Sequence, residues 1–81
     1  MTQERKIIAH LTVGQAEAVK EAITQRFTHI MQECTKEDMI DLFAEYHDSL
    51  AALYQLGFIW TAECYRNSYE EITGVEMKVE P

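Results

Sequence analysis

Apolar side chains recur every three or four residues along most of the chain, and this spacing favours helices more strongly than any other feature of the sequence. In the first half the repeat forms one stripe on a single helical face: Ala16, Val19, Ile23, Phe27, Ile30 and Cys34. Thr12 and Gln15 precede the stripe at the spacing of a helix cap and its reciprocal partner. The pattern predicts a helix that starts at about Val13.

A second helix start follows at Thr35, with Asp38 three residues later and acidic residues in the first turn, where the helix dipole favours them. The apolar spacing then continues in two runs that are offset by one position: Met39, Phe43, Tyr46, Leu50 and Leu53, followed by Phe58, Ala62, Tyr65, Tyr69 and Ile72. Gly57 stands between the runs, flanked by large apolar residues and not by the polar residues typical of turns. We therefore predict one long helix over residues 36–73, bent near Gly57, with a break at that glycine as the alternative.

Both ends of the chain carry short segments typical of strands. Residues 6–11 are apolar and partly β-branched, and residues 75–80 alternate apolar with polar side chains at period two. Gly74 is placed to end the long helix in the left-handed conformation. The sequence predicts a single, mainly α domain over residues 1–81, in which two amphipathic helices lie between short terminal β-strands.

The predicted helices carry more apolar surface than one chain of this design would cover. A chain near this size buries only roughly 60 to 65% of its unfolded surface, and a two-helix hairpin is too thin to cover a band that is apolar on several sides. Symmetric pairing into a dimer or tetramer is the usual remedy. Tyrosine and tryptophan suit such a contact because each joins a polar group to an apolar ring. Because the aromatic residues also follow the apolar spacing, the core of one chain is the alternative place for them. We expect an oligomeric helical bundle with this interface: Leu50, Leu53, Tyr54, Phe58, Trp60, Tyr65 and Tyr69.

Acidic residues outnumber basic ones by 14 to 7, which gives a formal net charge of −7 with neutral histidines. Because non-specific nucleic-acid binding depends on lysine and arginine, this balance argues against a direct DNA or RNA partner. The longest apolar run, residues 56–60, is far shorter than the ~20 residues of a membrane span. The first residues also lack the apolar region of a signal peptide. We expect a cytoplasmic protein with no membrane partner.

The sequence contains no recognisable catalytic, metal-ligating or cofactor motif. Cys34 and Cys64 lie 30 positions apart and are predicted to be reduced, buried thiols. The histidines are scattered, and only His47, beside Asp48, has acidic neighbours that would make a pH-sensitive contact. We therefore predict no catalytic residue, no metal ligand and no cofactor.

The clearest charge feature is the stretch of residues 33–48, which holds six acidic residues and one lysine. Four of the acidic residues recur at helical spacing and form what we call the acidic face: Glu37, Asp41, Glu45 and Asp48. Like charges four residues apart slightly destabilise a helix, so helix stability does not account for this pattern. A solvated surface that keeps the protein soluble is one explanation. A docking surface for a basic protein is the other.

The sequence favours a small non-enzymatic regulatory protein that binds and modulates another protein. Among proteins of this size and charge, the analogy is to inhibitors and antirepressors of mobile elements, which capture a DNA-binding regulator. A metal-dependent nucleotide hydrolase is a first alternative, because Glu45-x-x-Asp48 matches half of the acidic pattern of helical magnesium-dependent pyrophosphohydrolases. The upstream half of that pattern is absent. A structural subunit of a larger assembly is the second alternative.

Overall fold

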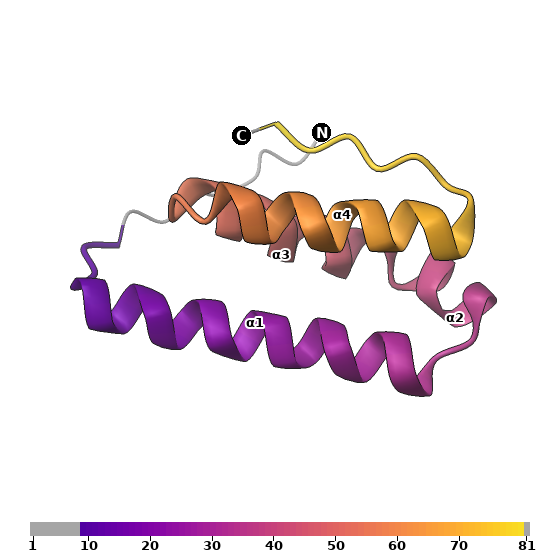
Figure 1. Ribbon diagram of the computed structural model, residues 1–81, viewed down its shortest axis with the longest axis horizontal. Coiled ribbons are helices and arrows are strands. Elements are labelled where there is room, and N and C mark those ends of the chain that lie inside the picture. The colour runs from indigo at the N-terminus through magenta and orange to yellow at the C-terminus, as the bar shows by residue number, and fades with distance from the viewer. Residues whose placement is uncertain (1–8, 81) are drawn as a thin grey trace, which may run out of the picture.

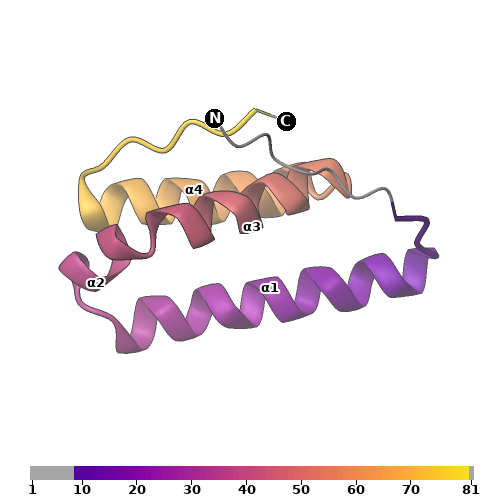
Figure 2. The ribbon, with the colours of Figure 1, turned by 180° about the vertical axis from the view of Figure 1, so that it is seen from behind.

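A computed structural model describes residues 9–80 and shows four helices in succession. They are α1 (Val13–Glu33), α2 (Lys36–Asp41), α3 (Phe43–Gln55) and α4 (Ile59–Thr73). Helix α1 forms one layer, α3 and α4 form the middle layer, and the segment after α4 runs back along the opposite side (Figures 1 and 2). The mainly helical architecture predicted from the sequence is confirmed.

The start of α1 follows from the local hydrogen bonds that were expected. The hydroxyl of Thr12 accepts from the amide of Gln15 at 3.1 Å, and the side chain of Gln15 accepts from the amide of Thr12 at 2.9 Å. Two amides at the helix start that have no partner within the helix are satisfied in this way. The prediction of a helix beginning at Val13 with Thr12 as its cap is confirmed.

The prediction of a single long helix over residues 36–73 is wrong, because the chain breaks twice in this region. The first break is at Leu42, between α2 and α3. In a continuous helix the carbonyl of Met39 would accept from the amide of Phe43. Here that carbonyl accepts from the hydroxyl of Tyr69, on α4, at 3.0 Å. At this break the carbonyl of Met39 therefore has a partner from a distant part of the chain.

The second break is at Gly57, as in the alternative left open by the sequence. Gly57 has a φ of +90°, its amide bonds to the carbonyl of Tyr54 at 3.0 Å, and the amide of Phe58 bonds to the carbonyl of Leu53 at 2.9 Å. These two bonds are those of a Schellman motif, which ends a helix with a left-handed residue. An apolar residue directly after the glycine is a common part of this motif, so the apolar flanks of Gly57 are compatible with a turn.

Substitution at Gly57 tests this turn. A Cβ added there would meet no atom within 4 Å beyond its chain neighbours, so the expected loss on Gly57→Ala, about 1–2 kcal/mol, comes from the left-handed backbone alone. Gly74, with a φ of +71° at the end of α4, should respond in the same way. The matched control is Gly14→Ala inside α1, which should instead raise stability by up to about 1 kcal/mol. Urea denaturation measures all three, and an unchanged Gly57→Ala midpoint would contradict the assignment.

The strand predicted for residues 75–80 is not formed within the described part of the chain, although its alternation is real. Met77 and Val79 are buried at 1% and 8% exposure, whereas the intervening Lys78 is exposed. The amide of Met77 donates to the carboxylate of Glu70 at 2.8 Å, so a helix side chain replaces the strand partner. The other predicted strand, residues 6–11, lies mostly outside the described residues, and residues 9–11 are not in a strand.

The centre of the fold is a cluster of aromatic rings drawn from three helices. The ring of Tyr46 lies 4.2 Å from that of Phe27 and 4.7 Å from that of Tyr69, measured between centroids. The hydroxyl of Tyr46 donates to the carbonyl of Tyr65 at 2.7 Å. Among the described residues no buried side-chain nitrogen or oxygen lacks a hydrogen-bond partner. The cluster therefore joins α1, α3 and α4 without leaving polar groups unsatisfied.

The structure gives no support to the expected oligomeric bundle. That expectation depended on a two-helix hairpin, whereas residues 9–80 form four helices with an extended segment packed against them. Two breaks let the chain fold back on itself and cover the apolar rows internally. Leu50 and Leu53, for example, are fully buried within one chain.

Candidate protein-binding surface

The acidic face is divided between two helices. Glu37 and Asp41 lie on α2, Glu45 and Asp48 lie on α3, and all four residues are exposed. The break at Leu42 falls between the pairs, so they do not form a stripe along one helix as the sequence suggested. The surface is instead carried by two helical segments joined at a turn.

Glu45 is already engaged within the chain. Its carboxylate accepts from Nε of Arg26 at 3.0 Å and from Nη2 at 3.4 Å, a two-pronged contact between α1 and α3. The hydrogen bond and the charge of Glu45 raise the pKa of Arg26. Glu45 therefore helps to position α1, which makes it the least available member of the acidic face.

Asp48 lies beside a histidine that contacts the segment after α4. Its carboxylate is 3.6 Å from Nδ1 of His47, while Nε2 of His47 donates to the carbonyl of Lys78 at 3.1 Å. The Asp48 side chain is 76% exposed, so most of it stays open to a partner. The ring of His47 therefore contacts both its acidic neighbour and the C-terminal segment.

Glu37 and Asp41 are the two members without a bond inside the described part of the chain. No hydrogen bond or ion pair between either side chain and another residue of 9–80 occurs. By contrast, the neighbouring Asp38 caps α2 through the amide of Thr35 at 3.4 Å. The charges of Glu37 and Asp41 are thus uncompensated and solvent-facing.

The carboxylates do not converge on a common point. Within residues 9–80 no group of three or more His, Cys, Asp or Glu side chains is placed to hold a metal ion. The nucleotide hydrolase alternative requires such a convergence of carboxylates. The geometry of the described carboxylates therefore does not favour it.

The residues expected at an oligomer interface fall into three groups. Leu50, Leu53, Tyr54 and Tyr69 are buried in the core of the single chain. Phe58 and Tyr65 are half-buried: Lys20 lies 5.1 Å from the ring centroid of Phe58, and Tyr65 packs 5.0 Å from Phe27. Trp60 alone is largely open, at 77% exposure. Only Trp60 offers a partner most of its surface.

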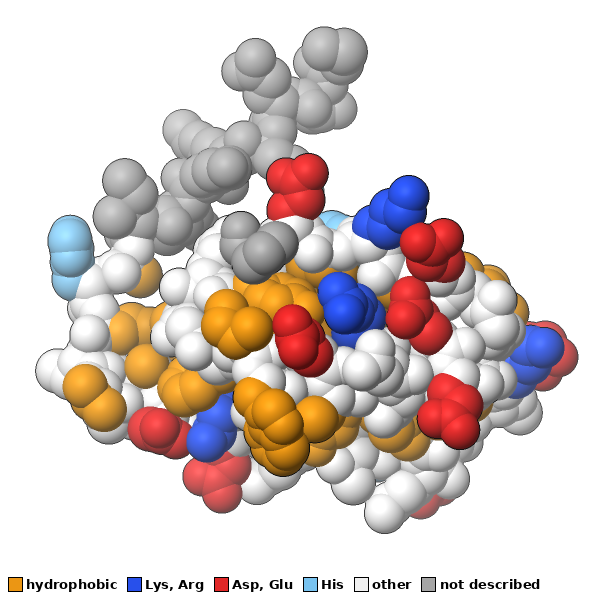
Figure 3. Space-filling view, turned by 45° about the horizontal axis from the view of Figure 1, so that its top comes forward, with side chains coloured by type: hydrophobic (Ala, Val, Ile, Leu, Met, Phe, Trp, Pro, Cys, Tyr) orange, Lys and Arg blue, Asp and Glu red, His pale blue; other side chains and the backbone are white. Residues whose placement is uncertain are grey.

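A second surface, which the sequence pattern did not predict, is the outer face of α4. Its members are all exposed and follow helical spacing: Trp60, Glu63, Cys64, Asn67 and Glu71. Cys64, expected to be buried, is on this face, whereas Cys34 is half-buried. Exposed hydrophobic side chains lie among acidic and basic ones on the side of the molecule shown in Figure 3. The helical spacing of the apolar residues could have predicted this exposure. Trp60 lies about 160° around the helix from Ala62, which is buried.

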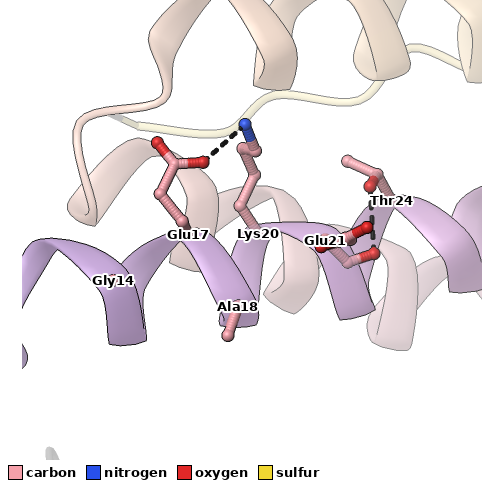
Figure 4. Close-up of a pocket in the computed structure, with 6 residues that line it drawn as sticks. All are labelled: Gly14, Glu17, Ala18, Lys20, Glu21 and Thr24. Atoms are coloured by element: carbon pink, nitrogen blue, oxygen red, sulfur yellow. Dashed lines mark hydrogen bonds and ion pairs between the residues drawn. The ribbon is translucent and has the colours of Figure 1, made fainter.

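A shallow depression lies along the first half of α1, at the residues drawn in Figure 4. The depression there is lined by residues of α1 alone, and Ala18 points away from the other labelled side chains (Figure 4). Glu17 and Lys20 form an ion pair of 2.9 Å within it. Substrate pockets usually take walls from several elements, so this depression does not resemble one.

Comparison with protein families, curated proteins and solved structures finds no match for this chain. Among the residues described, none of the helices combines the length and apolarity needed to cross a membrane. The function of the chain therefore has to be inferred from its surfaces.

Proposed function

We propose that this protein acts by binding another protein, of basic character, and that it regulates that partner without catalysing a reaction. The observation that carries the proposal is the pair Glu37 and Asp41, exposed and without a charged partner among residues 9–80. Residues 36–55 hold five acidic side chains and one lysine. A surface of one sign attracts and orients a partner of the other sign.

A DNA-binding regulator is the partner class that fits this chemistry. Proteins that bind DNA carry lysine and arginine on the surface that neutralises phosphates. Exposed carboxylates on α2 and α3 present negative charge to the same basic side chains. A protein of this kind would act as an inhibitor or antirepressor, by occupying the surface that its partner uses for DNA.

Charge reversal on this surface tests the proposal. Asp41→Lys with Asp48→Lys should lower the association rate with a basic partner by about tenfold or more, because electrostatic steering becomes repulsion. Glu45 is left unchanged, since a lysine there would face Arg26 and disturb the packing of α1. The variants are compared by capture from host lysate at low and high salt, followed by kinetics with the captured protein.

The matched control is Glu21→Lys with Glu33→Lys, which changes the net charge equally at exposed positions of α1 that are not members of the acidic face. The control should retain the captured protein, and both variants should keep the helical circular dichroism of the parent. Equal retention by the two variants would contradict a role for the acidic face. Equal loss would show that net charge alone governs capture.

A further inference from the structure

The outer face of α4 combines an open aromatic ring with negative charge. Trp60 is 77% exposed, which is unusual for a large apolar side chain that a fold normally covers. Glu63 follows one helical turn later and is also exposed. No described basic side chain lies over the Trp60 ring, whereas Lys20 lies over Phe58. The face is therefore unpartnered within the described chain.

The charge of this face determines what fits it. It carries Glu63 and Glu71 and no basic residue, because the single base of α4, Arg66, lines the groove beside the C-terminal segment. Two copies meeting through this face would bring like charges together, since a two-fold contact uses the same patch on both chains. A partner with a positive charge avoids that repulsion.

Arginine is the cation that suits both the exposed indole ring of Trp60 and the carboxylate of Glu63. Its guanidinium is planar and weakly hydrated, so it stacks on an indole ring more readily than the compact ammonium of lysine. The same group forms two-pronged bonds to carboxylates. We propose that Trp60 and Glu63 form an arginine-binding site, in which the indole stacks on the guanidinium of a partner protein and the carboxylate pairs with it.

This inference rests on the proposed function in one respect, namely that the partner is basic. It places a contact on α4, whereas the acidic face lies on α2 and α3. Glu71 is eight residues beyond Glu63, about 12 Å along the helix, and is therefore outside the site. This separation provides a matched control on the same face.

The experiment uses Trp60 as its own reporter, because it is the only tryptophan of the chain. The full protein, kept reduced because Cys64 is exposed, is titrated with arginine and lysine homopeptides of equal length while its fluorescence is recorded. The arginine peptide should alter the emission and bind about two- to fivefold more tightly than the lysine peptide. Glu63→Gln should weaken arginine binding by about twofold, and Glu71→Gln should have a smaller effect.

A variant without Trp60 has lost the fluorescent side chain and needs a second measurement of binding. With Trp60→Leu, binding is followed by the anisotropy of labelled peptides, and the preference for arginine over lysine should disappear. Equal affinity for the two peptides in the parent protein, or equal effects of Glu63→Gln and Glu71→Gln, would overturn the site. A concentration-dependent shift of the free protein's emission to shorter wavelength would also overturn it, by showing that a second copy covers Trp60.

The two proposals fail in different ways. The variant Asp41→Lys with Asp48→Lys should keep the preference for arginine in this titration even if its capture of a cellular partner is lost. Loss of the preference in that variant would show that the peptides report overall charge and would overturn the site on α4. Failure of the capture experiment alone would leave the titration result standing.

Discussion

Replacement of Tyr46 by alanine should abolish the cooperative unfolding transition of the protein. Tyr46 is fully buried and its ring packs against those of Phe27 and Tyr69, so the substitution opens a cavity where α1, α3 and α4 meet. Removing a buried aromatic ring costs about 3–5 kcal/mol. Whole domains have only about 5–15 kcal/mol of stability, and small ones lie at the lower end. Thermal melting followed by circular dichroism measures the effect.

Tyr46→Phe is the control because it keeps the ring and removes only the hydroxyl. The lost hydrogen bond is the one to the carbonyl of Tyr65, and its removal should cost about 1 kcal/mol with cooperativity retained. A melting curve for Tyr46→Ala that matches that of Tyr46→Phe would contradict the central position of this ring.

Removal of residues 75–81 should have the second largest effect. Met77 and Val79 belong to the same core cluster as Tyr54, and burying each such side chain is worth at most about 1.5–3 kcal/mol. The truncation also takes away the partners of His47 and Glu70. We expect a large decrease in the urea midpoint, measured beside the full chain.

A variant with changes only at exposed positions of the same segment serves as the control. It shows whether the stability of the protein depends on the buried side chains of the segment. Glu76→Ala with Lys78→Ala keeps the backbone and the two buried side chains, and both altered residues are exposed. Its stability should stay within about 0.5 kcal/mol of the parent. An unchanged urea midpoint for the truncated chain would show that the segment is only loosely attached.

Local signals in the sequence predicted part of this fold. The capping partners at Thr12 and Thr35 identified two helix starts, because each cap involves residues only three positions apart. The alternation of residues 75–80 likewise predicted which side chains are buried. It could not predict the partner, since helix side chains, including the carboxylate of Glu70, replace the edge of a sheet.

The breaks in the long apolar segment were harder to predict for two different reasons. At Gly57 the local signal was present, in a glycine followed by an apolar residue that completes a Schellman motif. At Leu42 the flanking residues include no glycine or proline, and the carbonyl of Met39 bonds to a tyrosine 30 residues away. Such a contact exists only after α4 has packed against α2.

The surfaces were likewise predictable where they depend on local spacing and not where they depend on contacts between distant residues. Helical spacing predicted an exposed acidic face, and its four members are indeed exposed. Spacing could not show that Arg26, on another helix, engages Glu45. The predicted interface between chains took in residues that are buried within one chain, such as Leu50 and Leu53, because the return of α4 against α3 was not predicted. The same return turns Trp60 outward.

The position of α1 as an outer layer has a consequence for how the molecule opens. Phe27 and Ile30, which are its buried residues, lie in its second half, while Val13 at its start is 82% exposed. Amide hydrogens are protected from exchange according to the free energy of the opening that exposes them. Those in the first turns of α1 should therefore exchange through local fraying, well before those of α3 and α4. The fold thus has a labile edge beside a slowly exchanging centre.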